Sequence, residues 1–276
     1  MGRVWLVTGA SSGLGRAIAQ AALAAGDVVV GAARRAEALA DLVAAHPDQM
    51  EALALDVTDT AAAEAAVRDV VARHGRVDVL VNNAGRTHVG ALEETTDAEL
   101  RELFELHVFG PAALVRAVLP HLRRRRSGAI VQMSSMGGRM SVAGFGAYSG
   151  TKFALEGMSE ALADEVREFG VKVLIVEPGA FRTSLFAGGR AGVSADSGQY
   201  PAVERTRAYV ESGDGTQPGD PAKAAALVVA ALDAEETPLH LPLGDDAVTA
   251  VLDHLDRVRA EVTAWEKRTR NTAFDA

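Results

Sequence analysis

Tyr148 and Lys152 lie four residues apart in a stretch with a helical pattern, so both side chains should share one helix face. A phenol ionises at about pH 10 in water, and a nearby ammonium lowers that pKa because it stabilises the phenolate. The pair therefore predicts general acid–base chemistry at a reacting oxygen. Ser135, at the end of an apolar run, has a hydroxyl that can hydrogen-bond the same oxygen as charge develops. Taken singly, the tyrosine is also explained by packing and the serine by helix capping.

A glycine-rich stretch ends the first apolar run and leads directly into a helical pattern. Glycines permit a tight turn and a close approach to a ligand. The helix N-terminus that follows offers N–H groups and a positive dipole to a pyrophosphate. Its spacing, G-x-x-x-G-x-G, differs from the usual dinucleotide fingerprint, and a tight turn without a ligand also explains it. The residues expected to contact a dinucleotide are Gly9, Ser11, Ser12, Gly13, Leu14 and Gly15.

Further motifs follow in a fixed order along the chain. They are Asn82-Asn83-Ala84-Gly85, Ser134-Ser135, the Y-x-x-x-K of Tyr148 and Lys152, and Pro178-Gly179 with Thr183 beyond. With the glycine turn, this set resembles the short-chain dehydrogenase/reductase family over about residues 3–185. The stretch Lys152–Gly157 is also similar to members that act on retinoids and steroids.

The resemblance implies an oxidoreductase that moves a hydride between a nicotinamide cofactor and a carbonyl–alcohol pair. Ser135, Tyr148 and Lys152 would be catalytic, and Lys152 would also hold the nicotinamide ribose. It further implies cofactor contacts from Asn83, Ala84, Gly85, Tyr148, Lys152, Pro178, Gly179 and Thr183.

His107 departs from the family pattern. Members commonly carry an asparagine in this setting, and its carbonyl is thought to hold a water that links the lysine to solvent. A histidine also donates and accepts hydrogen bonds, and it titrates near neutrality. Two interpretations stay open: His107 replaces the asparagine in a catalytic proton relay, or it fills the same space and hydrogen-bonds the backbone.

The end of the second apolar run indicates which cofactor is used. An NAD enzyme needs a carboxylate there for the ribose 2′-hydroxyl, and Ala33 stands at that position. Arg34 and Arg35 follow, and guanidinium groups suit a 2′-phosphate, so the sequence favours NADP over NAD. The alternative is that both arginines are solvated and Glu37 reaches the ribose. Further on, Asp56-Val57 resembles the family's adenine-binding pair, although Asp56 is also suited to cap the helix that follows.

Short apolar runs alternate with longer amphipathic stretches, which predicts a doubly wound parallel sheet of seven strands with helices on both faces, a Rossmann-type α/β fold. One domain over residues 1–276 is expected. The predicted strands are Val4–Val7, Val28–Gly31, Ala52–Leu55, Val77–Val81, Ala129–Met133, Val171–Val176 and Leu239–Leu241. The predicted helices are Leu14–Ala25, Ala36–Ala45, Thr60–Arg73, Asp97–Arg126, Ala147–Glu168 and Pro221–Leu232.

Two segments interrupt this alternation. Residues 180–219 are rich in Gly and Ser, and we expect them to form a lid over the substrate, ordered by ligand, with a helix at Ala202–Val210 that moves on glycine hinges such as Gly188 and Gly189. Without ligand, trypsin should cleave this lid after Arg190, Arg205 or Arg207. The apolar cover would come from Phe181, Leu185, Phe186 and Tyr200, which predicts an apolar substrate. The second segment, Asp246–Arg270, has a helical apolar face that must pack on the domain or on a partner subunit.

Composition sets the outer limits. The chain has 276 residues, and 37 acidic against 28 basic side chains give a net charge of −9, which argues against nucleic-acid and anionic-membrane partners. There is no Cys, no apolar run near the ~18 residues that span a bilayer, and no metal-ligand spacing at His240 or His254. We expect a cytoplasmic enzyme with a small-molecule substrate. By resemblance, it should form a homodimer or homotetramer through Asp97–Arg126 and Ala147–Glu168.

Two other functions remain as rivals. The first is a nucleotide-binding sensor or scaffold that has lost catalysis, which only His107 favours. The second is another reaction on the same scaffold, such as epimerisation or dehalogenation. The intact set of Ser135, Tyr148 and Lys152 argues against the first, and the unaltered Tyr–Lys pair and glycine turn argue against the second.

Overall fold

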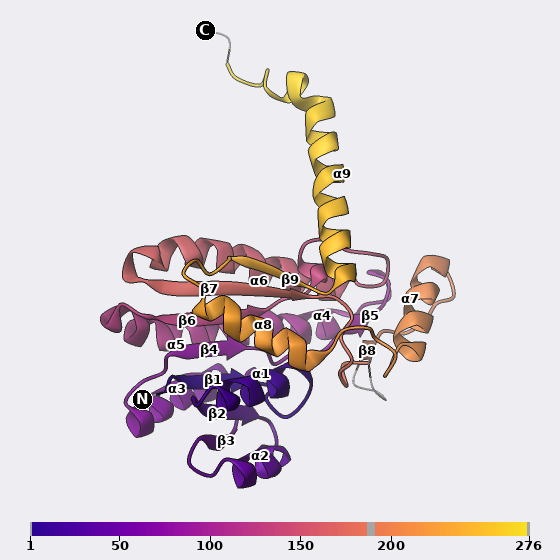
Figure 1. Cartoon of the computed structure of the whole chain (residues 1–276). Coiled ribbons are helices and arrows are strands. Elements are labelled where there is room, and N and C mark those ends of the chain that lie inside the picture. The colour runs from indigo at the N-terminus through magenta and orange to yellow at the C-terminus, as the bar shows by residue number, and fades with distance from the viewer. Residues whose placement is uncertain (1, 187–190, 275–276) are drawn as a thin grey trace.

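A computed structural model describes residues 2–186 and 191–274 of the chain (Figure 1). Its centre is a parallel sheet of seven strands in the order β3-β2-β1-β4-β6-β7-β9. The strands are β1 (Val4–Thr8), β2 (Val28–Ala33), β3 (Met50–Ala54), β4 (Val79–Asn82), β6 (Gly128–Met133), β7 (Val171–Pro178) and β9 (His240–Leu243). All seven predicted strands are confirmed, and so is the doubly wound fold.

Helices cover both faces of the sheet. On one face lie α1 (Gly13–Ala24), α2 (Ala40–Ala45) and α8 (Pro221–Asp233), and on the other lie α3 (Thr60–His74), α5 (Gly110–Arg125) and α6 (Gly146–Val166). Strand β1 is buried along its whole length, with Trp5 and Val7 in one core and Val4 and Leu6 in the other. This burial on both faces explains why the strands appear as continuous apolar runs.

The longest predicted helix proves to be three joined segments. They are α4 (Asp97–Phe104), a π-helical turn (Glu105–Phe109) and α5. Over its 29 residues this helix includes a window of mean hydropathy 1.3, which is long and apolar enough to cross a membrane by length and composition alone. Charged residues such as Glu105 and Arg116 interrupt this stretch, so it does not appear as an unbroken apolar run in the sequence. Half of the window is buried, as in a core helix of a folded domain.

Short elements complete the chain. The 3-10 turns are Ala36–Leu39, Met136–Gly138 and Arg167–Phe169. A separate two-stranded sheet pairs β5 (His88–Val89) with β8 (Gly192–Val193), and α7 (Pro201–Ser212) forms where Ala202–Val210 is predicted. The last helix, α9 (Asp245–Thr269), projects away from the sheet and its covering helices (Figure 1).

Candidate active site

A cavity of about 1220 Å³ runs along the carboxyl ends of the strands. It crosses the point between β1 and β4 where the strand order reverses, which is where doubly wound sheets bind ligands. Of the predicted site residues, Gly15 and His107 are the two that do not line it. Those that do are Gly9, Ser11, Ser12, Gly13, Leu14, Arg34, Arg35, Asp56, Val57, Asn83, Ala84, Gly85, Ser135, Tyr148, Lys152, Pro178, Gly179 and Thr183.

The glycine turn has a backbone that other residues would strain. Gly9 and Gly13 have φ angles of 65° and 56°, in the left-handed region that glycine adopts at little cost. Gly15 is needed for a different reason: a Cβ there would lie 2.6 Å from the Gly9 carbonyl oxygen. Gly15 therefore lies behind the turn and lets α1 pack against it, and its predicted contact with a dinucleotide stays a prediction.

Asn83 lines the cavity, and its side chain holds the glycine turn in place. Its Nδ2 donates to the carbonyl oxygens of Thr8 (2.9 Å) and Gly9 (3.3 Å). In the other direction, the Thr8 hydroxyl accepts hydrogen bonds from the backbone N–H groups of Asn83 (2.9 Å) and Ala84 (3.1 Å). The ends of β1 and β4 are thus tied together, so the asparagine positions the turn through the protein's own backbone.

The catalytic candidates come together at the end of β6. Lys152 is buried, and its Nζ donates to the Met133 carbonyl oxygen at 2.9 Å and lies 5.7 Å from the centre of the Tyr148 ring. Burial lowers the pKa of Lys152 to about 8, and the Glu156 carboxylate opposes that shift. Ser135 also accepts from the Gly137 N–H at 3.0 Å, so its side chain is held in one orientation.

The pKa of Tyr148 departs from the sequence-based expectation. We expected the neighbouring ammonium to lower it. Burial instead raises the pKa of Tyr148, and a hydrogen bond with Ser135 acts in the opposite direction. The reason is that desolvation penalises the phenolate while the Lys152 Nζ is directed to a carbonyl oxygen. In this structure the tyrosine is therefore a proton donor at neutral pH.

His107 lies in the π-helical turn and is almost fully buried. Its Nε2 accepts from the Arg86 backbone N–H at 3.2 Å, so Nδ1 carries the proton and donates to the Thr151 hydroxyl at 2.8 Å. That hydroxyl in turn donates to the Tyr148 carbonyl oxygen at 2.7 Å. Burial, with the charge of Lys152, lowers the pKa of His107 well below its usual value. Both ring nitrogens are thus engaged and the ring is neutral, which favours the space-filling interpretation over the relay.

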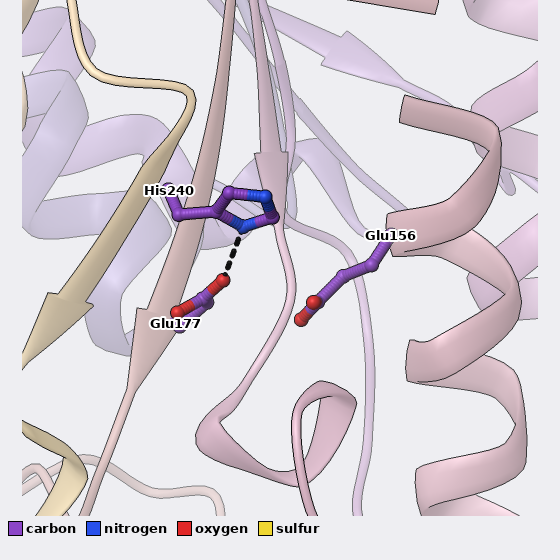
Figure 2. A group of neighbouring side chains, drawn as sticks. All are labelled: Glu156, Glu177 and His240. Atoms are coloured by element: carbon purple, nitrogen blue, oxygen red, sulfur yellow. Dashed lines mark hydrogen bonds and ion pairs between the residues drawn. The ribbon is translucent and has the colours of Figure 1, made fainter. Parts of the chain in front are cut away.

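A second cluster of polar side chains lies one helical turn beyond Lys152. Figure 2 shows Glu156 of α6, Glu177 of β7 and His240 of β9 pointing toward one another. Glu156 Oε1 accepts from the Ser134 hydroxyl at 2.5 Å, and Glu177 Oε1 lies 2.6 Å from His240 Nδ1. Tyr148, Lys152 and Glu156, at four-residue steps along α6, thus contact Ser135, Met133 and Ser134. The cluster fixes the strand end that carries Ser135.

The cluster has donor groups that metals use, and spacing along the sequence did not reveal it because three separate elements supply them. One ligand atom from each of the three residues lies within 4.8 Å of the others. The hydrogen bond to Glu177 raises the pKa of His240. Burial raises the pKa of Glu156 to about 7.

Residues that would discriminate between cofactors lie at the end of β2. Ala33 is buried, whereas Arg34 and Arg35 are exposed at the cavity and make no salt bridge with any described residue. Glu37 is exposed in the following turn and is not a cavity residue. Asp56 accepts from the Thr58 N–H at 3.0 Å and stabilises a turn. The suggested helix-cap role of Asp56 is wrong, because Asp59 caps α3.

Residues 180–186 and Gln217 contribute to the opposite wall of the cavity, and the segment 191–219, which includes α7, is anchored. Arg207 donates to Glu94 at 2.9 Å with both side chains nearly buried, and β8 pairs with β5. Hydrogen bonds from Ser197, with the backbone N–H of Ala91 and the Arg207 contact, lower the pKa of Glu94 to about 2. This anchoring disagrees with a helix moving freely on glycine hinges.

The cavity-facing part of this wall is shorter than expected. Phe181, Leu185 and Phe186 line the cavity as predicted, but Tyr200 does not, because its hydroxyl bonds to Glu93. The Thr183 side chain lies against Gly13, so this wall reaches the glycine turn. The predicted hinges Gly188 and Gly189 and the predicted cleavage site Arg190 lie outside the described residues. The predicted cleavage site at Arg207 is wrong, because that side chain is buried.

Residues 3–193 match the short chain dehydrogenase family. The chain belongs to this family. An oxidoreductase of Botryotinia fuckeliana is 40% identical over 252 residues, which are 90% of this chain and 91% of that protein. A 3-ketodihydrosphingosine reductase of Bacteroides thetaiotaomicron is 40% identical over 66% of this chain and 65% of its own length.

Solved structures of short-chain dehydrogenases agree with the fold. One from Streptomyces avermitilis is 63% identical, covers 98% of this chain and 100% of its own, and has a TM-score of 0.93. A metagenomic short-chain oxidoreductase in complex with NADP is 29% identical over 87% of this chain and 96% of its own, with a TM-score of 0.69. This short-chain dehydrogenase is accordingly an oxidoreductase that acts on CH–OH or carbonyl groups.

Proposed function

We propose that the protein is an NADP-dependent oxidoreductase that interconverts an apolar ketone or aldehyde and its alcohol. One observation carries this proposal: Ser135, Tyr148 and Lys152 line the same cavity as the glycine turn and the exposed Arg34 and Arg35. One continuous site therefore offers a proton donor, a pyrophosphate cradle and two cations.

The residues present fit a nicotinamide dinucleotide. Close packing at Gly15 brings the N-terminus of α1 to the cavity, and α1 has no acidic residue in its first turn to oppose a phosphate. Arg34 and Arg35 would hold a 2′-phosphate, and the small side chain of Ala33 leaves no carboxylate to repel it. A related protein in complex with NADP supports this preference. When bound, the cofactor supplies or accepts the hydride.

The protein's own groups would manage the proton and the reacting oxygen. Tyr148, protonated at neutral pH, donates to the carbonyl oxygen during reduction. The Ser135 hydroxyl would hydrogen-bond the same oxygen as negative charge develops. Lys152, held by the Met133 carbonyl oxygen, places a positive charge near the phenol and is positioned to bind the nicotinamide ribose.

The wall of the cavity opposite the glycine turn, which we call the substrate wall, supports an apolar substrate. Phe181, Leu185 and Phe186 line the cavity beyond the catalytic residues. The reductase of Bacteroides thetaiotaomicron, by its name, acts on a ketone of a sphingoid base, which supports ketones on an apolar body as the first compounds to test.

We also propose that the chain pairs through α4–α5 and α6, as other family members commonly do. Phe109, at the end of the π-helical turn before α5, and Phe153 and Met158, on α6, are each nearly half exposed. Apolar side chains on these helices would be covered by a second subunit.

The decisive experiment measures NADPH and NADH consumption with a panel of ketones and aldehydes, and the reverse reaction with their alcohols. We expect turnover of apolar ketones with NADPH. A Tyr148→Phe protein serves as the control for contaminating activities. Tight NADPH binding without turnover of any carbonyl or alcohol would contradict the proposal and favour the sensor function.

A further inference from the structure

Helix α9 extends beyond the body of the protein with almost nothing packed against it (Figure 1). Ala247 and Val251, in its first two turns, are its buried residues, and every residue from Leu255 to Phe274 is exposed. Val262 and Trp265 are 64% and 57% exposed, although they are large apolar side chains. Isolated helices depend on packing of an apolar face for stability, so this face needs a partner.

The apolar side chains of α9 follow a regular spacing. Steps of three and four residues alternate along the helix, which is the pattern of a coiled-coil seam. The seam consists of Val248, Val251, Leu255, Val258, Val262 and Trp265, and all of these except the buried Val251 are exposed. At 1.5 Å per residue it is roughly 26 Å long. Leu252 lies beside the seam and is also exposed. A seam of this kind fits another helix better than a flat surface.

The charges of α9 divide the helix into two unlike halves. Residues 245–256 contain four acidic and no basic side chains. Residues 257–269 contain four basic and two acidic side chains. The sign changes between Asp256 and Arg257, and this point is also the midpoint between the seam ends Val248 and Trp265.

We propose that α9 pairs with α9 of a second copy of this chain, antiparallel, with the two-fold axis at that midpoint. This axis places each acidic half against the basic half of the other copy, as a self-complementary interface requires. It also places Leu255 against Val258 of the other copy at the centre of the seam. Parallel pairing would align acidic with acidic halves and is disfavoured. A lipid surface is a poorer partner because membrane-surface helices carry basic polar faces, and half of this one is acidic.

The first test is the molar mass in solution, measured by light scattering on the full-length protein over a range of concentrations. Wild type should contain α9 pairs, and Leu255→Asp with Val258→Asp should halve the mass of the assembly. Ala260→Asp with Thr263→Asp adds the same charge outside the seam and should leave the mass unchanged. Circular dichroism would verify that each variant folds.

The antiparallel orientation of the two α9 helices is tested by cross-linking. The chain has no native cysteine, so only the introduced cysteines react. A mixture of His254→Cys and Glu261→Cys proteins should form a linked heterodimer with a short bismaleimide, because antiparallel pairing brings these positions together. Thr269→Cys alone should not link.

Three results would overturn the proposal. The first is a seam variant whose molar mass equals that of wild type. The second is strong cross-linking of Thr269→Cys with itself. The third is a wild-type protein whose α9 is unpaired and which sediments with phosphatidylcholine vesicles.

Discussion

The two walls of the cavity are built differently. The nucleotide wall, at the ends of β1, β2 and β4, consists of backbone turns held by hydrogen bonds between neighbouring strands, such as those from Asn83 to Thr8 and Gly9. The substrate wall, residues 180–186 and 191–219, is fixed through side chains far apart in the sequence, above all Glu94 and Arg207. We infer that the nucleotide wall determines that a dinucleotide binds. Substitutions in the substrate wall should then have little effect on dinucleotide binding.

Tyr148→Phe should give the largest difference between an effect on catalysis and an effect on cofactor binding, because the tyrosine lies between the two walls. The substitution removes the hydroxyl and keeps the ring packing against His107 and Phe145. We expect kcat/KM to fall by on the order of 10²–10⁴-fold, the usual contribution of a positioned acid, while NADPH affinity stays within a few-fold. Steady-state kinetics and a direct binding titration measure the two effects. Near-normal turnover would show that another group donates the proton.

The nucleotide wall alone is changed by Ala33→Asp combined with Arg34→Ser. A carboxylate at the end of β2 repels a 2′-phosphate, and one charge-assisted contact is lost. The ratio of kcat/KM for NADPH to that for NADH should fall by about ten- to a hundredfold. Glu37→Gln, in the next turn, is the matched control and should leave the ratio unchanged. A wild type that already prefers NADH would refute our interpretation of Arg34 and Arg35.

The substrate wall alone is loosened by Arg207→Met. Loss of the bond to Glu94 should release α7, raise the KM for the carbonyl substrate by about tenfold and leave NADPH binding unchanged. Trypsin should cleave faster after the exposed Arg205. Glu204→Gln removes the exposed partner of Arg207 and should have a smaller effect. Equal loss of cofactor and substrate binding would mean that the walls are not independent.

The smallest expected effect concerns the Glu156 cluster, which lies behind both walls. Burial raises the pKa of Glu156 from 4.5 to about 7, so between these values the folded protein keeps a proton that the unfolded chain releases. Its stability should therefore fall as pH rises from about 4.5 to about 7. Glu156→Gln should flatten this part of a plot of melting temperature against pH. Glu165→Gln, exposed on the same helix, should not. Parallel curves for wild type and Glu156→Gln would exclude this carboxyl as the source.

The nucleotide wall was largely predictable from sequence because its chemistry depends on local patterns. Glycines at fixed spacing, the ends of buried strands and the four-residue step from Tyr148 to Lys152 are all visible in one dimension. The seven strands were predictable for a similar reason, since burial on both faces makes each an apolar run.

The parts that escaped prediction depend on contacts between distant segments. Glu94 and Arg207 are separated by 113 residues, and no periodicity links them. Glu156, Glu177 and His240 meet only because β7 and β9 are neighbours in the sheet. The pKa of Tyr148 was predicted in the wrong direction, because the effect of an ammonium was considered without the burial that opposes it.

The two tryptophans of the chain occupy opposite extremes of solvent exposure. Trp5, in the central strand β1, is fully buried and donates its indole N–H to Asp27 at 2.8 Å, whereas Trp265 lies in the exposed part of α9. Their fluorescence therefore reports on different events. A Trp265→Phe protein would emit only from the sheet and follow global unfolding. A Trp5→Phe protein would emit only from α9, where a shift of emission to shorter wavelength signals that its apolar face has become covered. The chain thus carries separate optical reporters for its core and its protruding helix.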